Sequence, residues 1–280
     1  MLDHLRRLVK HSVAYGLAET ISRGTGFLLV FFYGFILSSE DIGLRGAIYS
    51  AATFIAVFYT FGLDNSFLRY FMDSGLANRK KDIFTTATVF SSLIGLVALV
   101  LVFFGDAAVS RLLTKSESYT ALTRILFIII LFDNIVIYPT LVLRAENRIG
   151  YYSFIALLRF VLFIVLNALF VWYLKRGLDG VFEANLLVVV IVTAALFPVY
   201  AEYMKGRVSS DMLRRMLAFG IPTIFSILCM RVVDYSDKLL ILYLLGDEGA
   251  SQLGGYNMAY TPGMVGIMVF VNSFRLAWQP

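Results

Sequence analysis

Four charged residues interrupt an apolar stretch at 217–246, and they are the first candidates for chemistry in this sequence. They are Arg231, Asp234, Asp237 and Lys238. Positions three, four and seven apart return to the same side of an α-helix, so Arg231, Asp234 and Lys238 share one face. Charged groups at membrane depth are costly and normally turn toward a protein interior or a watery cavity. The pattern predicts the wall of a polar chamber inside a bundle of membrane helices.

A second pair of charges lies in the first apolar stretch. Glu19 and Arg23 are four residues apart with the acid first, which is the favourable order for a helical ion pair. Two interpretations stay open: the pair neutralises itself, or Arg23 presents its charge to an anionic substrate while Glu19 tunes it. Arg159 and Arg275 could line the substrate cavity together with Arg23. Arg275 equally suits an anchor at the inner face of the membrane, where its side chain would reach the lipid headgroups.

Two carboxylates lie within or beside other apolar stretches. Asp64 closes one of them, and Asp133 interrupts another shortly before Pro139. A buried carboxylate is a candidate for proton or sodium coupling. The structural alternative is hydrogen bonding to neighbouring helices or to backbone freed near Pro139. The residues predicted to act in coupling or gating are Glu19, Asp64, Asp133, Asp234, Asp237 and Lys238.

The sequence lacks the common catalytic motifs. It has no Gly-x-x-x-x-Gly-Lys-Ser/Thr phosphate loop, no Cys/His cluster, no G-x-S-x-G elbow and no HExxH. The long outer loop at 105–118 has no histidine, which argues against a membrane glycan ligase or polymerase. We therefore expect no catalytic residue, no metal and no cofactor. The single cysteine, Cys229, is expected to be a small buried hydrophobe.

The composition predicts which elements position these residues. Of the 280 residues, 59% are hydrophobic and 15% are charged, and the mean hydropathy is +0.80. Soluble domains are about half apolar and a quarter charged. The chain is therefore expected to be an all-α polytopic membrane protein. Its net charge of +5 is spread over loops, which argues against nucleic-acid binding.

Eight segments approach the roughly 20 apolar residues that are needed to cross a bilayer. The short connections between them predict antiparallel neighbours. The predicted spans are 13–37, 42–63, 83–104, 121–143, 151–173, 180–201, 217–245 and 253–279.

Basic residues in the loops predict the orientation of these spans. One side holds the larger set and is expected to face the cytoplasm together with the N-terminus: Arg6, Arg7, Lys10, Arg69, Arg79, Lys80, Lys81, Arg144, Arg148, Lys205, Arg207, Arg214 and Arg215. The other side holds Arg45, Arg111, Lys115, Lys175 and Arg176.

A weak internal repeat predicts the domain organisation. Asn-Ser-Phe at 65–67 recurs at 272–274, and Tyr-Gly at 15–16 resembles Phe-Gly at 219–220 at nearly the same offset. A six-span repeat enters the membrane twice in the same direction and forms two lobes around a cavity. We therefore expect one complete six-helix lobe at 1–207. Residues 208–280 are expected to hold a linker and the first two helices of a second, truncated lobe.

The stretch DYSDKLLILYLLG at 234–246 resembles the polysaccharide or O-antigen flippases of the multidrug/oligosaccharidyl-lipid/polysaccharide exporter superfamily. So do Gly-Tyr at 255–256, FRLAWQP at 274–280 and FGLDNSFLR at 61–69. The resemblance follows the whole chain in span order, but its motifs are loose. It implies twelve to fourteen helices in two six-helix lobes, of which this sequence contains eight.

The resemblance implies that the protein moves an undecaprenyl-diphosphate-linked oligosaccharide from the inner to the outer leaflet of the cytoplasmic (inner) membrane. Membrane lipids, a polysaccharide polymerase and glycosyltransferases are the implied partners. Arg23, Arg159, Arg231 and Arg275 would line the cavity, with Arg23 and Arg275 beside the lipid gap and Arg231 facing Arg23. The alternatives are a drug/cation antiporter of the same superfamily and, from another class, a membrane glycan ligase or polymerase.

Overall fold

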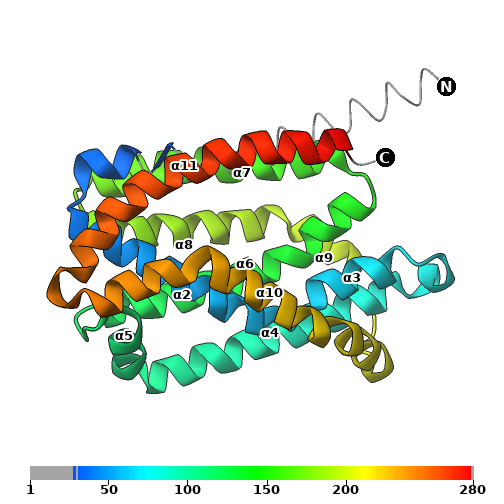
Figure 1. Cartoon of the computed structure of the whole chain (residues 1–280). Helices are drawn as coiled ribbons and strands as arrows, with labels where there is room; N and C mark the ends of the chain where they lie inside the picture. The colour runs from blue at the N-terminus through cyan, green and yellow to red at the C-terminus, as the bar shows by residue number, and fades with distance from the viewer. Residues whose placement is uncertain (1–27, 30, 279–280) are drawn as a thin grey trace. The chain divides into compact units, whose positions relative to one another are not determined.

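A computed structural model of the chain describes residues 28–29 and 31–278, except for the side chains of Asp247 and of residues 265–278. All secondary structure in these residues is helical, with no strand (Figure 1). The helices are α2 (Ser39–Thr60), α3 (Leu63–Phe71), η1 (Ser74–Arg79), α4 (Lys80–Phe104), α5 (Asp106–Thr114), α6 (Thr120–Ala145), α7 (Ile149–Asn167), η2 (Ala168–Tyr173), α8 (Gly177–Ala195), α9 (Phe197–Tyr203), α10 (Ser210–Leu244), η3 (Gly246–Glu248) and α11 (Gly249–Trp278).

Six helices in the described part are long and apolar enough to cross a membrane. They are Ser39–Thr60, Ser74–Phe104, Thr120–Ala145, Ile149–Tyr173, Gly177–Ala195 and Ser210–Leu244. These six overlap the predicted spans between 42 and 245. The remaining two predicted spans, 13–37 and 253–279, lie partly outside the description, so the count of eight stays a prediction.

Several of these helices expose large apolar side chains over most of their length. Outward faces of this kind are stable when they face lipid rather than water. The all-helical architecture and these faces establish a multi-pass membrane protein. Examples on α4 and α7 are Leu93, Leu96, Leu101, Phe154, Leu157, Val161 and Val165.

The chain divides into two compact units. Unit 1 contains Met1–Gly46, Ile149–Ala184 and Ile241–Pro280, and unit 2 contains Ala47–Arg148 and Asn185–Leu240. Each unit has its own internal packing. The predicted lobe boundary at 207/208 stays a prediction.

An aromatic cluster fills part of the unit 2 core. The Phe67 ring stacks on Phe71 at 5.1 Å between centroids and meets Tyr138 edge-on at 5.4 Å. Phe84 packs against Tyr203 at 5.6 Å, so α3, α4, α6 and α9 meet in this region. Burying such rings is strongly favourable and fixes the helices on which the polar residues described below are carried.

In unit 1, α2 and α11 approach through residues without bulky side chains. A Cβ on Gly43 would lie 1.7 Å from the Ala250 carbonyl oxygen, and one on Gly254 would lie 1.9 Å from the Ser39 carbonyl oxygen. The Ser39 hydroxyl donates to the Ser251 carbonyl at 2.8 Å. Only small residues allow two helix backbones to pack this closely in a membrane protein.

Candidate functional site

The charged stripe of α10 is organised around an aromatic ring. The guanidinium of Arg231 lies over the Tyr235 ring at 5.8 Å from its centroid, and the ammonium of Lys238 lies over the same ring at 4.9 Å. Tyr235 therefore lies within cation–π distance of two cations, which offsets part of their desolvation. Sequence reasoning missed Tyr235, although its place four residues after Arg231 and three before Lys238 is readable in the sequence.

All four predicted charges of this stripe are half-buried. The backbone N–H of Lys238 donates to Oδ1 of Asp237 at 2.8 Å, so that carboxylate serves the local helix backbone. Arg231 Nε is shielded from solvent and has no hydrogen-bond partner in the described part of the chain. Cys229 on the same helix is exposed, which corrects the expectation that it is buried.

Some of the other residues predicted for the cavity lining or for coupling lie within the described part of the chain, and some lie outside it. Arg159 is half-buried in α7 of unit 1, and Asp133 is half-buried in α6 of unit 2. Glu19, Arg23 and the side chain of Arg275 lie outside the described residues. The predicted meeting of Arg23 with Arg231 therefore stays a prediction.

A break between α2 and α3 places Asp64. Phe61 (φ 48°) and Gly62 (φ 68°) are both left-handed, which ends α2 and starts α3 in a new direction. A Cβ on Gly62 would lie 2.3 Å from the carbonyl oxygen of Gly220 in α10, so a side chain is excluded at this crossing. Transporters commonly use broken helices to place polar groups near their binding sites.

Asp64 lies in the first turn of α3, beyond the end of the α2 span. Backbone N–H groups of Asn65 and of Asp64 itself support the carboxylate, as expected at a helix N-terminus. Burial is the larger influence and raises the pKa of the Asp64 carboxyl above its ordinary value. Its Oδ1 atom is buried and has no hydrogen-bond partner in the described part.

Further buried polar side chains lie on the helices beside α3. The hydroxyls of Ser91 and Tyr138 share a hydrogen bond of 2.5 Å, and Asn134 Nδ2 donates to the Ser91 carbonyl at 3.1 Å. Two polar atoms are left without hydrogen-bond partners in the described part: the amide oxygen Asn134 Oδ1 and the hydroxyl Thr88 Oγ1, on residues only 2% and 4% exposed. Together with Asp64, we call these residues the unit 2 polar cluster: Asp64, Thr88, Ser91, Asn134 and Tyr138.

Sequence reasoning found only Asp64 of the unit 2 polar cluster as a site residue. A signal for the others exists, because Thr85, Thr88 and Ser91 follow one another at helical spacing within α4. Asn134 makes the kind of bond to a neighbouring helix that was the structural alternative for this region, because its amide donates to the Ser91 carbonyl of α4. Thr85 does the same, because its hydroxyl donates to the Tyr203 carbonyl at 3.3 Å.

Pro139 leaves a backbone carbonyl without its helical donor. Proline has no N–H, so the carbonyl of Ile135, four residues earlier, loses its bond inside α6. The Tyr200 hydroxyl in α9 donates to this carbonyl at 2.6 Å. The freed group is thus satisfied by a neighbouring helix and holds α6 against α9.

Unit 1 contains a different polar cluster, formed by Tyr33, Arg45 and Asn167. The Tyr33 hydroxyl donates to Asn167 Oδ1 at 2.6 Å, and Asn167 Nδ2 donates to the Phe163 carbonyl at 2.7 Å. Arg45 lies over the Tyr33 ring at 4.8 Å from its centroid. Arg45, which was counted among the basic residues of the outer side, lies within helix α2, and the side that it faces stays a prediction.

Ion pairs tie the segments of unit 2 that were predicted to face the cytoplasm. Both guanidinium nitrogens of Arg148 donate to Glu202, at 2.8 and 2.7 Å, and Arg148 also pairs with Glu146 at 2.7 Å. The Tyr203 hydroxyl bonds Glu146. Arg148 lowers the pKa of the Glu202 carboxyl, mainly through its hydrogen bonds. This network is structural, because each charge has its partner.

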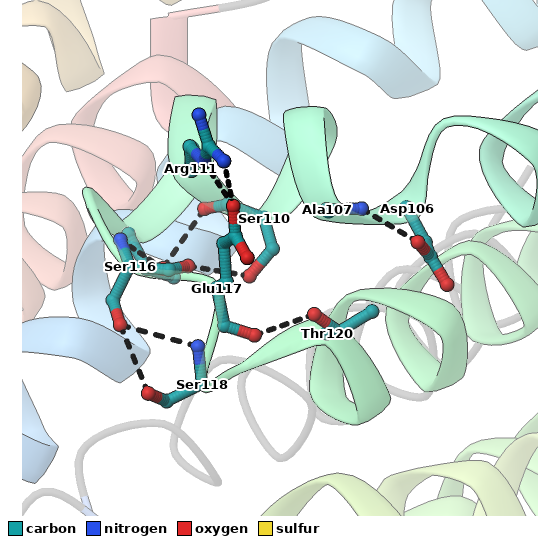
Figure 2. Close-up of polar contacts among 9 residues, drawn as sticks. Asp106, Ala107, Ser110, Arg111, Ser116, Glu117, Ser118 and Thr120 are labelled. Carbon is teal, nitrogen blue, oxygen red and sulfur yellow. Dashed lines mark hydrogen bonds and ion pairs between the residues drawn. The ribbon is translucent and has the colours of Figure 1, made fainter.

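The loop predicted at 105–118 contains a helix, α5, and a closed turn (Figure 2). Its polar groups bond one another: Ser110 donates to the Ser116 carbonyl at 2.7 Å, and Arg111 pairs with Glu117. The described residues include no group of three or more His, Cys, Asp or Glu side chains that could hold a metal. The Ser110–Ser116 hydrogen bond and the Arg111–Glu117 ion pair join residues of this loop to one another, and they stabilise its fold.

The comparisons with known proteins agree with the architecture. The sequence model of the family described as "Polysaccharide biosynthesis protein" matches residues 8–280. A search of curated proteins finds no match.

Three solved structures illustrate the likeness in fold. A multidrug resistance MATE family transporter of the MOP superfamily in an inward-facing conformation has a TM-score of 0.66 and 18% identity, over 92% of this chain and 59% of its own. A MATE in complex with Br-NRF has a TM-score of 0.65 and 20% identity, and the likeness covers 94% of this chain and 64% of that protein.

A MOP superfamily transporter from Pyrococcus furiosus, whose binding pocket is described as having reverse polarity, has a TM-score of 0.60 and 18% identity, over 90% and 60%. The chain thus spans about three fifths of the length of the solved structures that it matches. At identities this low, the structural similarity establishes the fold alone.

Proposed function

Because the chain belongs to the polysaccharide biosynthesis protein family, we propose that it is a membrane transporter that flips a lipid-diphosphate-linked oligosaccharide. The proposed direction is from the inner to the outer leaflet of the cytoplasmic membrane, during synthesis of an O-antigen, capsule or exopolysaccharide. The observation that carries the proposal is the family match along 8–280 on a chain with a MOP transporter fold. The N-terminus is proposed to be cytoplasmic.

The substrate class explains why arginine is found at membrane depth. A diphosphate cannot cross hydrocarbon unshielded, and the guanidinium fork of arginine is well suited to phosphate oxygens. Arg231 supports this role, because its Nε is buried without a hydrogen-bond partner in the described part and its charge rests on Tyr235. Arg23, Arg159 and Arg275 are proposed to contribute to the same basic lining.

No covalent step is needed for this function. Two lobes would expose the cavity to one leaflet and then to the other, while the polyprenyl tail stays in lipid. An ion gradient or the membrane potential would drive the cycle. Asp64, Asp133 and Asp234 are proposed to serve coupling, and Glu19, Asp237 and Lys238 to serve coupling or gating. Glycosyltransferases and a polysaccharide polymerase are the proposed partners.

The second candidate function is a drug/cation antiporter. Its support is that similar solved structures include MATE proteins and that the half-buried Asp64 of unit 2 has a shielded Oδ1 atom without a hydrogen-bond partner in the described part. Such a transporter binds cations through carboxylates, so its activity would depend on Asp64 rather than on Arg231.

Transport by the full-length protein in proteoliposomes separates the two. The assay measures the rate at which a labelled polyprenyl-diphosphate oligosaccharide moves between leaflets. Arg231→Ala is expected to slow this rate roughly tenfold to a hundredfold, since a charged hydrogen bond is worth about 1.5–3 kcal/mol. Arg231→Lys should retain part of the rate. The control is Arg214→Ala, an exposed arginine nearer the start of α10.

The proposal requires that transport of the lipid-linked sugar be measurable and that an arginine change reduce it. If Arg23→Ala and Arg231→Ala both transport at the wild-type rate, the diphosphate role is wrong. If the protein exchanges lipophilic cations but not the lipid-linked sugar, the antiporter is the correct function.

A further inference from the structure

The linker at 204–209, which joins α9 to α10 in unit 2, packs directly on the first turn of α4. A Cβ on Gly206 would lie 2.2 Å from the carbonyl oxygen of Lys81, so a side chain is excluded at this contact. The backbone N–H of Arg207 donates to Asp82 Oδ1 at 2.8 Å. The backbone of the linker is therefore fixed to α4, and its outward side chains are held in a defined place.

This packing gathers three exposed basic residues. Lys205 and Arg207 lie on the linker, and Lys81 lies on the helical turn that the linker contacts. The pKa of the Glu202 carboxyl is lowered first by its hydrogen bonds to Arg148. Lys81 and Lys205 lower this pKa further by electrostatic attraction, so both lysines lie near the same acid. We call Lys81, Lys205 and Arg207 the linker basic patch.

The acids beside the linker basic patch are engaged by other groups. Glu202 accepts two hydrogen bonds from Arg148. Asp82 accepts the backbone N–H of Arg207 and pairs with Arg79 at 3.7 Å. Within the described part of the chain, no ion pair involves a side chain of the patch. The patch therefore presents three positive charges at the surface.

Large apolar side chains flank the two cations of the linker. Met204 is 41% exposed and Val208 is 59% exposed, directly before Lys205 and directly after Arg207. At a lipid surface, apolar side chains enter the boundary of the acyl chains while lysine and arginine extend to the phosphates. The surface of an acidic protein would offer the two apolar side chains no such environment. The sequence of the linker therefore favours a phospholipid over an acidic protein.

The linker basic patch lies where membrane-crossing helices begin. Lys81 is near the start of the Ser74–Phe104 helix, and the Ser210–Leu244 helix begins directly after the linker. The ends of spans lie at the depth of the lipid headgroups. The patch is also on the side predicted to face the cytoplasm, where the leaflet contains anionic lipids that attract basic segments.

We propose that the linker basic patch, together with Met204 and Val208, is a binding surface for the headgroups of anionic phospholipids in the surrounding bilayer. The lipid phosphate would contact Lys81, Lys205 and Arg207, and the two apolar side chains would enter the acyl boundary. Such binding holds the linker and the start of α10 at a fixed depth. The inference does not rest on the proposed function, because none of these residues is assigned to transport.

The test is native mass spectrometry of the purified full-length protein, titrated with phosphatidylglycerol and, separately, with phosphatidylcholine. The wild type is expected to bind phosphatidylglycerol more tightly than the zwitterionic lipid. Lys81→Gln, Lys205→Gln and Arg207→Gln should each weaken binding of phosphatidylglycerol about fivefold, the contribution of one basic residue near an anionic lipid surface. The variant that combines all three changes should lose the preference between the lipids.

A charge-matched control removes three exposed basic side chains from the opposite predicted side of the membrane. It should keep the preference for phosphatidylglycerol, although its net charge equals that of the triple glutamine variant. The control combines Arg111→Gln, Lys115→Gln and Lys175→Gln.

Two further variants keep the test decisive if the triple glutamine variant does not fold. Lys81→Arg, Lys205→Arg and Arg207→Lys together retain the charges and should retain the preference for phosphatidylglycerol. Met204→Ser with Val208→Ser removes the apolar contacts and leaves the cations in place. It should weaken binding of both lipids by a similar factor, because both have acyl chains.

Two outcomes overturn the proposal. The first is a triple glutamine variant that prefers phosphatidylglycerol as strongly as the control does. The second is a wild type that shows no lipid preference but binds poly-glutamate through the three basic residues, which would assign the surface to an acidic protein. Neither measurement involves transport, so a protein that keeps the lipid preference but does not flip lipid-linked oligosaccharide refutes the proposed function alone.

Discussion

Asp64 and Glu202 are two carboxylates of the same unit that the protein treats in opposite ways. Glu202 receives two hydrogen bonds from Arg148, and the pair is 43% and 36% exposed. Asp64 is half-buried, and its shielded Oδ1 atom has no hydrogen-bond partner in the described part of the chain. The pKa of Glu202 is lowered by its arginine, and the pKa of Asp64 is raised by burial.

The difference indicates how structural and functional charges can be separated. A charge whose partner is supplied by the fold holds segments together and has no capacity left for a ligand. A buried charge without a partner lowers stability, and such groups are concentrated at functional sites.

The largest effect is expected from Gly62→Ala, which disrupts the placement of Asp64. An L-residue in the left-handed region costs about 1–2 kcal/mol, and the overpacking against Gly220 adds about 1–3 kcal/mol. We expect the unfolding transition of the purified protein to move sharply downward or to disappear. Gly150→Ala is the control, because a Cβ there meets nothing within 4 Å. Equal stability of the two variants would contradict the close crossing.

Asp64→Asn is expected to raise the free energy of unfolding at neutral pH by about 1–2 kcal/mol, because it removes the charge of a carboxylate whose Oδ1 is shielded and unpartnered in the described part of the chain. The pH dependence follows from the raised pKa. The folded protein binds the proton more tightly than the unfolded chain, so stability is full below the unfolded pKa and falls as pH rises through the folded pKa. Thermal unfolding at several pH values should show this slope in the wild type and a flatter profile in the variant.

Tyr200→Phe tests whether α9, which carries Glu202, also supports α6 of the unit 2 polar cluster. The change removes the donor to the Ile135 carbonyl and leaves that group unsatisfied beside Pro139. A loss of about 1 kcal/mol is expected. Tyr173→Phe, at an exposed tyrosine, should have no measurable effect on the same unfolding curve.

Arg148→Gln should have the smallest effect, about 1 kcal/mol or less, because the pair is more than one third exposed and is screened by solvent. Its pH dependence has the opposite sign to that of Asp64. The lowered pKa of Glu202 contributes stability above the unfolded pKa, and this is lost as pH falls through the folded pKa. Glu202→Gln should lose the same contribution. A loss of stability larger than that of Gly62→Ala would contradict the comparison.

The sequence predicted the apolar helices well, since long apolar runs leave few alternatives in a membrane protein. The span expected at 83–104 is α4, Lys80–Phe104, and that at 121–143 is α6, Thr120–Ala145. The break at Phe61 and Gly62 was not foreseen, because it depends on a contact with Gly220, far along the chain. The span at 42–63 was therefore predicted to end as a simple helix.

The candidate sites were predicted less completely, for a physical reason. Charged residues stand out in an apolar stretch, so Asp64 and Arg231 were found. Ser91, Asn134 and Tyr138 are uncharged and tolerated in any membrane helix, and only the packing of α3, α4 and α6 shows that they form a cluster.

The wide π-helical turn η2 has a consequence for the length of the chain. A π-helix uses more residues per turn than an α-helix, so Ala168–Tyr173 contains one residue more than regular winding requires. Removing a single residue there would restore α-helical winding without shifting the register of the chain after Leu174. We expect this to be the place where the α7 span tolerates a one-residue deletion, whereas the same deletion elsewhere in α7 would rotate every later side chain by about 100°.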